Sequence, residues 1–105
     1  MKLNGKEVRF NITDPRDAKR YEETLIKLKK KEKELKKSGQ EYTLDEIMRE
    51  IIKICREVLW DFTGQDVLKG CHDALMAKEV LYQFLREVAR QNESLLSPFD
   101  PERIR

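Results

Sequence analysis

Two helical patterns of apolar residues, separated by a short segment between two glycines, constrain the fold of this chain most strongly. In residues 47 to 62, apolar side chains recur at three- and four-residue spacing and occupy a broad face. Residues 75 to 88 repeat the pattern. The segment from Gly64 to Gly70 leaves room for no more than a turn of helix, which we interpret as a structural elbow. Two such apolar faces have to be buried, so the sequence predicts a small helical bundle.

The boundaries of a first helix and of the central helix can be read from capping residues. Thr13 or Asp14 precedes Pro15, which suits the first position of a helix. The helix that starts there has a narrow apolar stripe and should end at Ser38-Gly39. Thr43 and Glu46 then have the spacing of a capping box, so the central, most buried helix should begin between them.

The third helix should open near His72 or Asp73 and continue to about Asn92. Leu95 and Leu96 could add one more turn before the next proline. Nine further residues, 97 to 105, show no periodicity, and we expect a flexible tail there that only a partner would order.

Residues 2 to 12 predict a small β-hairpin. Asn4-Gly5 is the dipeptide that best accommodates the positive φ angles of a two-residue hairpin turn. Apolar residues then alternate with polar ones at Val8, Phe10 and Ile12, which gives the second strand one apolar face. A hairpin of this size is marginal alone, so that face should pack on the helices.

Together these elements give a mainly α (α+β) fold: an N-terminal β-hairpin, three main helices in a small bundle, and a short helical turn between the second and third helices. We expect a single helical domain over residues 1–96, followed by the tail 97–105. A chain of 105 residues buries only about 60 to 65% of the surface that its unfolded form exposes. The core is therefore modest, which leaves apolar surface for a partner or for self-association into a homo-oligomer.

The composition argues against a membrane-spanning, secreted or strongly nucleic-acid-attracting protein. No apolar run approaches the roughly 20 residues that cross a bilayer, and the first residues lack the apolar centre of a signal peptide. We therefore expect no membrane association and a cytoplasmic location. In that reducing compartment Cys55 and Cys71 should stay thiols. The net charge of +2 gives no overall attraction to nucleic acid.

We find no catalytic constellation, and we expect neither an enzyme, nor a metal site, nor a cofactor. Cys71-His72 offers two adjacent candidate ligands, but the chain contains only two cysteines and one histidine, and structural zinc requires four ligands. Adjacent residues at a helix start also point apart, which disfavours a Cys-His nucleophile. Gly64 and Gly70 are not followed by the Lys-Ser or Lys-Thr of a phosphate-binding loop.

A lysine-rich run is the first candidate binding surface. Residues 27 to 37 hold seven lysines and two glutamates, a local charge of 7 − 2 = +5. The run lacks interleaved aromatic and arginine residues, so we favour a solvated helix face over a nucleic-acid site. Contact with an acidic protein surface stays open, and its candidate residues are Lys29, Lys30, Lys31 and Lys33.

Four aromatic residues form the second candidate surface. Trp60, Phe62, Tyr82 and Phe84 could line a groove for an apolar partner helix, although each could also be a core or rim residue. Trp60 and Tyr82 lie off the main apolar stripes and are the better candidates for exposure.

Several segments resemble a family of small phage proteins. They are the opening Leu3-Asn4-Gly5-Lys6-Glu7-Val8, the Tyr21-Glu22-Glu23 triplet, and Phe62 to Gly70 leading into the helix with Tyr82, Phe84 and Leu85. In prophages of Gram-positive bacteria, similar proteins are tail assembly chaperones, encoded between the tail tube and tape measure genes. The resemblance implies a cytoplasmic protein of the bacterial host that binds the tape measure protein and helps to bring tail tube subunits to it.

Two other functions remain open. Phage genomes also encode small helical inhibitors or adaptors that bind host defence proteins, and such a protein would have the same composition. Nucleic-acid binding through the lysine-rich run is a weaker third hypothesis.

Overall fold

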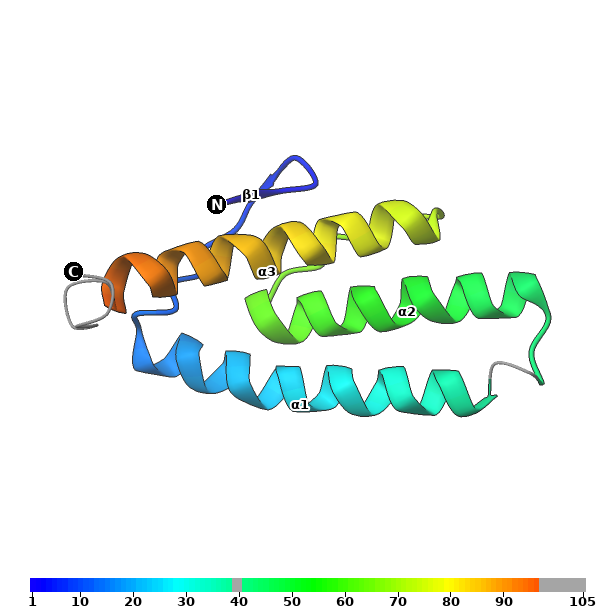
Figure 1. The fold of residues 1–105 in the computed structure, drawn as a ribbon. Helices are drawn as coiled ribbons and strands as arrows, with labels where there is room; N and C mark the ends of the chain where they lie inside the picture. Colours follow the sequence, from blue (N-terminus) through cyan, green and yellow to red (C-terminus); the bar gives the residue numbers. More distant parts are fainter. Residues whose placement is uncertain (39–40, 97–105) are drawn as a thin grey trace.

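The computed structural model describes residues 1–38 and 41–96, and it confirms the expected hairpin followed by three helices (Figure 1). The elements are β1 (Lys2–Leu3), β2 (Lys6–Glu7), α1 (Pro15–Ser38), α2 (Leu44–Thr63) and α3 (Ala74–Leu96). The expected stop at Gly39 and the expected tail, residues 97–105, lie outside the described residues.

The helices α1 and α3 begin where an aspartate side chain caps them. A carboxylate oxygen of Asp14 accepts the backbone N–H of Arg16 at 2.9 Å, just before α1. Asp73 does the same for Met76 at 3.0 Å, so Asp73 rather than His72 precedes α3. Each carboxylate accepts a hydrogen bond from one of the backbone N–H groups that a helix start leaves unpaired. Its negative charge also interacts favourably with the positive end of the helix dipole.

The ends of α2 also follow from local chemistry. The backbone N–H of Thr43 donates to the Glu46 carboxylate at 3.2 Å, as the capping-box spacing predicts. At the other end Gly64 has a φ of +73°, and its N–H donates to the Trp60 carbonyl at 2.7 Å. Glycine adopts this left-handed conformation without the steric penalty of a Cβ atom, so the helix stops there.

The central helix α2 packs against both other helices, in opposite senses. Lys27 and Lys31 of α1 form ion pairs with Asp61 and Glu57 of α2, respectively, so the two helices are antiparallel. In contrast, α3 runs parallel to α2 (Figure 1). The chain therefore has to return along α2 before α3 can start.

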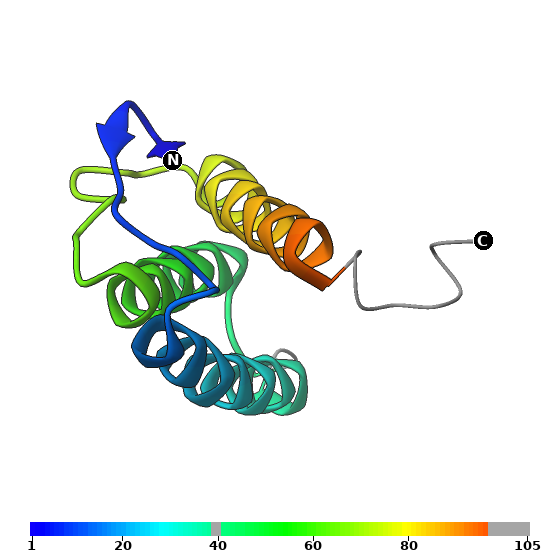
Figure 2. The same cartoon turned by 90° about the vertical axis from the view of Figure 1, so that its left-hand side faces the viewer.

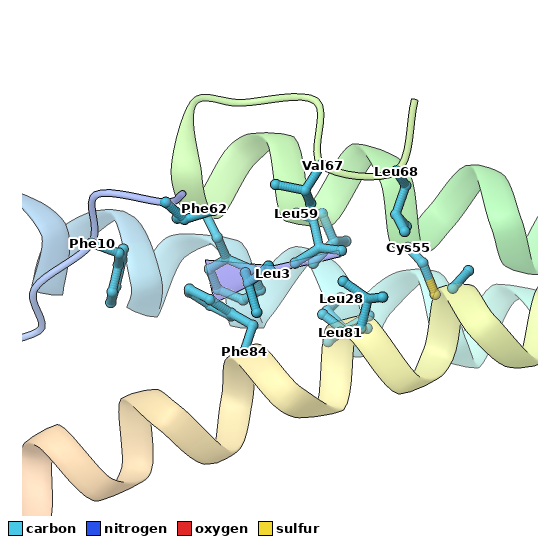
Figure 3. Packing of buried hydrophobic residues seen from close by; sticks show 14 of the residues in the cluster. Leu3, Phe10, Leu28, Cys55, Leu59, Phe62, Val67, Leu68, Leu81 and Phe84 are labelled. Carbon is cyan, nitrogen blue, oxygen red and sulfur yellow. The ribbon is translucent and has the colours of Figure 1, made fainter. Parts of the chain in front are cut away.

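Residues 64–73 make this return, and our interpretation of the segment as a short helical elbow needs correction. Two successive backbone turns are present instead, with Lys69 N–H donating to the Asp66 carbonyl and Cys71 N–H to that of Leu68. Val67 and Leu68 have no exposed surface, because they fill the space beside α2 and α3 (Figure 3). A helical turn would shorten the segment, whereas a parallel third helix requires it to run back along the C-terminal half of α2, where Leu68 lies beside Cys55 (Figure 3).

The hairpin is shorter than predicted. Asn4 and Gly5 have φ angles of +51° and +76°, both positive as a type I′ turn requires. The strands, however, are only two residues long, and the last hydrogen bonds between the arms join Met1 and Val8. The Asn4 side-chain amide donates to the Val67 carbonyl at 2.8 Å, so the turn is fixed to the return segment.

Beyond the hairpin, the expected second strand continues as an extended segment that lies between α1 and α3, past the end of α2 (Figure 2). Its backbone pairs with a side chain instead of a strand. The Gln91 amide of α3 donates to the Phe10 carbonyl at 3.4 Å and accepts the Ile12 N–H at 3.1 Å. The predicted alternation is nevertheless present, because Val8 and Phe10 are buried and Arg9 is exposed.

An aromatic cluster, defined as Phe10, Tyr21, Phe62 and Phe84, joins the N-terminal segment to all three helices. The Phe10 and Phe84 ring centroids are 4.9 Å apart at 74°, an edge-to-face contact, and those of Phe62 and Phe84 are 4.8 Å apart. Tyr21 adds a ring 5.4 Å from that of Phe62. Such pairs contribute about 0.5–1.5 kcal/mol beyond the burial of their area. Leu3 of the hairpin packs beside this cluster (Figure 3).

We predict that Phe10→Ala lowers the free energy of unfolding by about 3–5 kcal/mol, because it removes a ring that contacts both α1 and α3. Urea titration followed by circular dichroism measures the change. The neighbouring exposed Arg9 provides the control, and Arg9→Ala should change the same quantity by less than about 0.5 kcal/mol. Equal effects of the two substitutions would contradict a structural role for the Phe10 ring.

Candidate protein-binding groove

An open groove lies between α1 and α3, with α2 as its floor. Both helices pack on α2, but within the described residues no Cα atom of α1 comes within 8 Å of one in α3. The space between them has a volume of about 350 Å³. Its apolar lining is Leu28 and Leu35 from α1, Ile51, Ile54 and Cys55 from α2, and Leu81 and Leu85 from α3.

The apolar surface continues beyond this groove in both α2 and α3. Met48 and Leu44 lie three and seven residues before Ile51 and therefore on the same face of α2, where 39% and 72% of their surfaces are exposed. On α3, Leu75 lies seven residues before Tyr82, and the two are 66% and 49% exposed. From residue 44 to residue 55 this apolar face of α2 is roughly 16 Å long, about three turns of a helix, and its C-terminal part is the floor of the groove.

The four predicted aromatic residues do not form one surface, and two of them need correction. Phe62 and Phe84 have no exposed surface, because they lie on the faces of α2 and α3 that form the aromatic cluster. Tyr82 lines the groove and is half exposed. Trp60 is 53% exposed but lines a different, shallow depression on α2, together with Arg56 and Asp66.

The lysines of the predicted surface also fall into two groups, one paired with α2 and one exposed. Lys31 donates a hydrogen bond to the Glu57 carboxylate of α2, and Lys27 lies 3.6 Å from the Asp61 carboxylate. These two lysines join α1 to α2 and are not free for a partner. Lys29, Lys30 and Lys33 are exposed.

The exposed lysines lie on two sides of α1. Lys36 lines the groove. Lys29 and Lys33 precede it by seven and three residues, so the three form one row on that side of α1, and Lys29 and Lys33 lie outside the groove lining. Lys30 lies two residues after Leu28, about half a turn around the helix from the core face, and points away from the groove.

Sequence reasoning missed the residues that make the groove. Leu35, Ile51 and Leu85 belong to the apolar stripes that the sequence predicts to be buried, but in the structure they are only half buried. One signal was available. The narrow stripe of α1 cannot cover the broad faces of α2 and α3, so part of those faces had to stay uncovered.

The groove floor contains a thiol without nucleophilic character. Burial raises the pKa of Cys55 to about 11, and the nearby Lys78 ammonium offsets only part of this effect. A thiol with that pKa is almost wholly protonated at neutral pH. Cys71 is partly exposed and lies outside the groove lining, and both cysteines are free. Within residues 1–38 and 41–96, no three His, Cys, Asp or Glu side chains are grouped to hold a metal ion.

The comparisons with known proteins give a family but no activity. The model of a family of unknown function matches residues 4–103. No curated protein and no solved structure matches the chain. In the part of the chain that the structure describes, no helix has the length and apolar character to cross a membrane.

We predict a pH dependence for the ion pair between α1 and α2. The hydrogen bond from Lys31 lowers the pKa of Glu57, so the folded protein binds this proton less tightly than the unfolded chain does. The ionised pair therefore stabilises the fold above the unfolded pKa, and the contribution is lost as pH falls through the lowered folded pKa.

Glu57→Gln should accordingly reduce the free energy of unfolding at pH 7 by about 0.5 kcal/mol, since both side chains are partly exposed. Urea titrations between pH 7 and pH 3 should show the difference from the wild type vanish at the acid end. Glu23→Gln, at an exposed position of α1, serves as the control and should show a smaller difference at pH 7. A difference for Glu57→Gln that grows as the pH falls would contradict the assignment.

We also predict that the two thiols react at different rates. With an aromatic disulfide reagent at pH 8, Cys71 should react rapidly and Cys55 only after unfolding, because Cys55 is buried and protonated. The Cys71→Ser variant should thus show one slow thiol and Cys55→Ser one fast thiol. Equal rates in the native protein would show that the groove floor opens freely.

Proposed function

This chain belongs to a family of unknown function (DUF6673), and from its groove we propose that it is an assembly chaperone that binds an amphipathic helix of a partner protein. The observation that supports this proposal is the uncovered apolar floor of α2 between α1 and α3. Proteins that hold amphipathic helices use grooves of this kind, in which side chains at positions i, i+3, i+4 and i+7 enter the apolar trough.

The size of the groove suits such a helix. The floor and the apolar face of α2 that continues from it are together roughly 16 Å long and accommodate about three turns, and two turns of a helix are enough to present a row of three or four apolar side chains. Met48, Leu75 and Tyr82 are exposed at the edges and would be covered by the bound helix.

The surface also suits a complex that has to be released. Leu28, Ile54 and Leu81 are already buried in the floor, and Ile51 and Leu85 are half buried. A partner helix therefore gains apolar contact mainly with the half-exposed edges, and the additional buried area is modest. A chaperone that transfers its client to a growing assembly needs such limited affinity.

The resemblance to tail assembly chaperones of Gram-positive phages suggests the partner. We propose the tape measure protein, a long helical protein whose apolar stripes require cover before the tail forms, with the tail tube protein as the second component. The complex would form in the cytoplasm of the bacterial host. Helices with uncovered apolar stripes associate non-specifically, and a groove that covers them one segment at a time would keep them available for assembly.

A second candidate function is an inhibitor or adaptor that binds a host defence protein. The exposed indole of Trp60 favours it, because this side chain lies away from the groove, and exposed tryptophans are often central to protein interfaces. The two functions place the essential surface on different faces of α2.

We predict that Tyr82→Glu and Met48→Glu each reduce recovery of the tape measure protein at least ~10-fold, because each puts a charge at the edge of the groove. The measurement is co-purification after co-expression with the neighbouring tape measure and tail tube genes, at low and at moderate salt. Trp60→Glu is the matched control, being equally exposed on the other face, and should leave recovery unchanged.

Failure of the wild type to co-purify with either protein would contradict the chaperone function. Loss of a host partner with Trp60→Glu alone would instead favour the inhibitor or adaptor.

A further inference from the structure

Both walls of the groove carry a lysine, and this positive charge bears on which helix the groove can bind. On α1, Lys29, Lys33 and Lys36 form an exposed row at positions i, i+4 and i+7, and Lys36 of this row lines the groove. On the α3 wall, Lys78 lines the groove with its ammonium 6.0 Å from the centre of the Tyr82 ring. Glu32 is the one carboxylate in the groove lining. The charged residues that line the groove are therefore Lys36, Lys78 and Glu32, a charge of 2 − 1 = +1, and Lys29 and Lys33 continue the basic row outside the lining.

The carboxylates that could neutralise α1 lie on its other side. Asp61 and Glu57 of α2 pair with Lys27 and Lys31, on the side of α1 that faces away from the groove opening. Within the described residues, no ion pair of 4 Å or less joins a carboxylate to Lys29, Lys33 or Lys36. The basic row along the groove therefore has no close acidic partner from its own fold, apart from the helix-surface neighbour Glu32.

From this arrangement we infer that the groove selects an amphipathic helix that carries carboxylates beside its apolar stripe. The apolar stripe lies on Ile51, Leu81 and Leu85, and the acidic flank faces the lysine row of α1. A helix with lysine or arginine in the same flank would bring like charges together and would be rejected. The inference rests on the proposed function, to which it adds the charge pattern of the partner.

The same charges argue against a second copy of this chain as the occupant. In a two-fold symmetric contact the same patch faces itself, so both lysine rows and both Lys78 side chains would be brought together. Such a contact has a cost that grows as salt is reduced. An acidic helix, in contrast, gains affinity under those conditions.

The experiment uses two fluorescent peptides of about 18 residues, which is long enough to span the groove floor. Both carry the same leucine stripe at i, i+3, i+4 and i+7, and their flanks are glutamate in one peptide and lysine in the other. Binding to the full chain is measured by fluorescence anisotropy at about 50 mM and about 300 mM salt. We expect the glutamate peptide to bind at least ~10-fold more tightly at the lower salt, with a smaller preference at the higher salt.

Three variants locate the effect. The triple variant Lys29→Glu, Lys33→Glu, Lys36→Glu should reverse the preference. Its matched control is Lys2→Glu, Lys19→Glu, Lys69→Glu, three exposed lysines that belong neither to this row nor to the groove lining, which changes the net charge equally and should keep the preference. Tyr82→Glu, at the groove edge, should weaken both peptides.

The outcomes separate this inference from the proposed function. Equal binding of both peptides, lost in Tyr82→Glu, would overturn the acidic-flank inference and leave helix binding intact. Binding of neither peptide would overturn both. If the matched control also reversed the peptide preference, the preference would depend on net charge alone, and the inference would be overturned. The inference would also be overturned if the protein were a dimer that Tyr82→Glu converts to a monomer, because a second copy would then be the occupant.

Discussion

The aromatic cluster of Phe10, Tyr21, Phe62 and Phe84 is the contact on which the rest of the structure depends. It brings together one residue from each of the four parts of the chain that have to be positioned: the N-terminal segment, α1, α2 and α3. At this end of the bundle Phe10 lies between α1 and α3, beyond the end of α2, and Gln91 fixes the backbone around it. The N-terminal segment thereby closes the space between the two outer helices.

The groove lies where the space between the two outer helices is not closed in this way. At the other end of the bundle, the described chain supplies no segment that fills the space between α1 and α3, so Ile51 and Leu85 stay half exposed. Ion pairs from Lys27 and Lys31 hold α1 to α2 on the outer side, which leaves Lys29, Lys33 and Lys36 along the opening. The lysines of α1 thus have two roles. Those on one side of the helix pair with carboxylates of α2, and those on the other side stay exposed along the groove opening.

Local sequence signals predicted most of the fold. The capping residues before α1 and α2, the glycine after α2 and the Asn-Gly turn were identified because each acts through atoms only a few residues apart. Predictions that depended on distant contacts did less well. Residues 8–12 alternate as a strand does, yet their backbone pairs with Gln91, a residue 79 positions from Ile12. Residues 64–73 run back along part of α2 instead of forming a short elbow, because α3 is parallel to α2 and not antiparallel.

The sequence by itself determined three amphipathic helices, where they start and a β-turn, since periodicity and capping are properties of neighbouring residues. It also indicated that the apolar faces exceed what this chain can bury, because the stripe of α1 is narrow. Only the tertiary structure decided which apolar residues stay uncovered and which lysines are free. Those properties depend on the direction of α3 and on the rotation of α1 against α2, and contacts between distant residues set both. Phe62 and Tyr82 show the difference: both are aromatic residues on apolar helices, and packing places one in the core and the other at the edge of the groove.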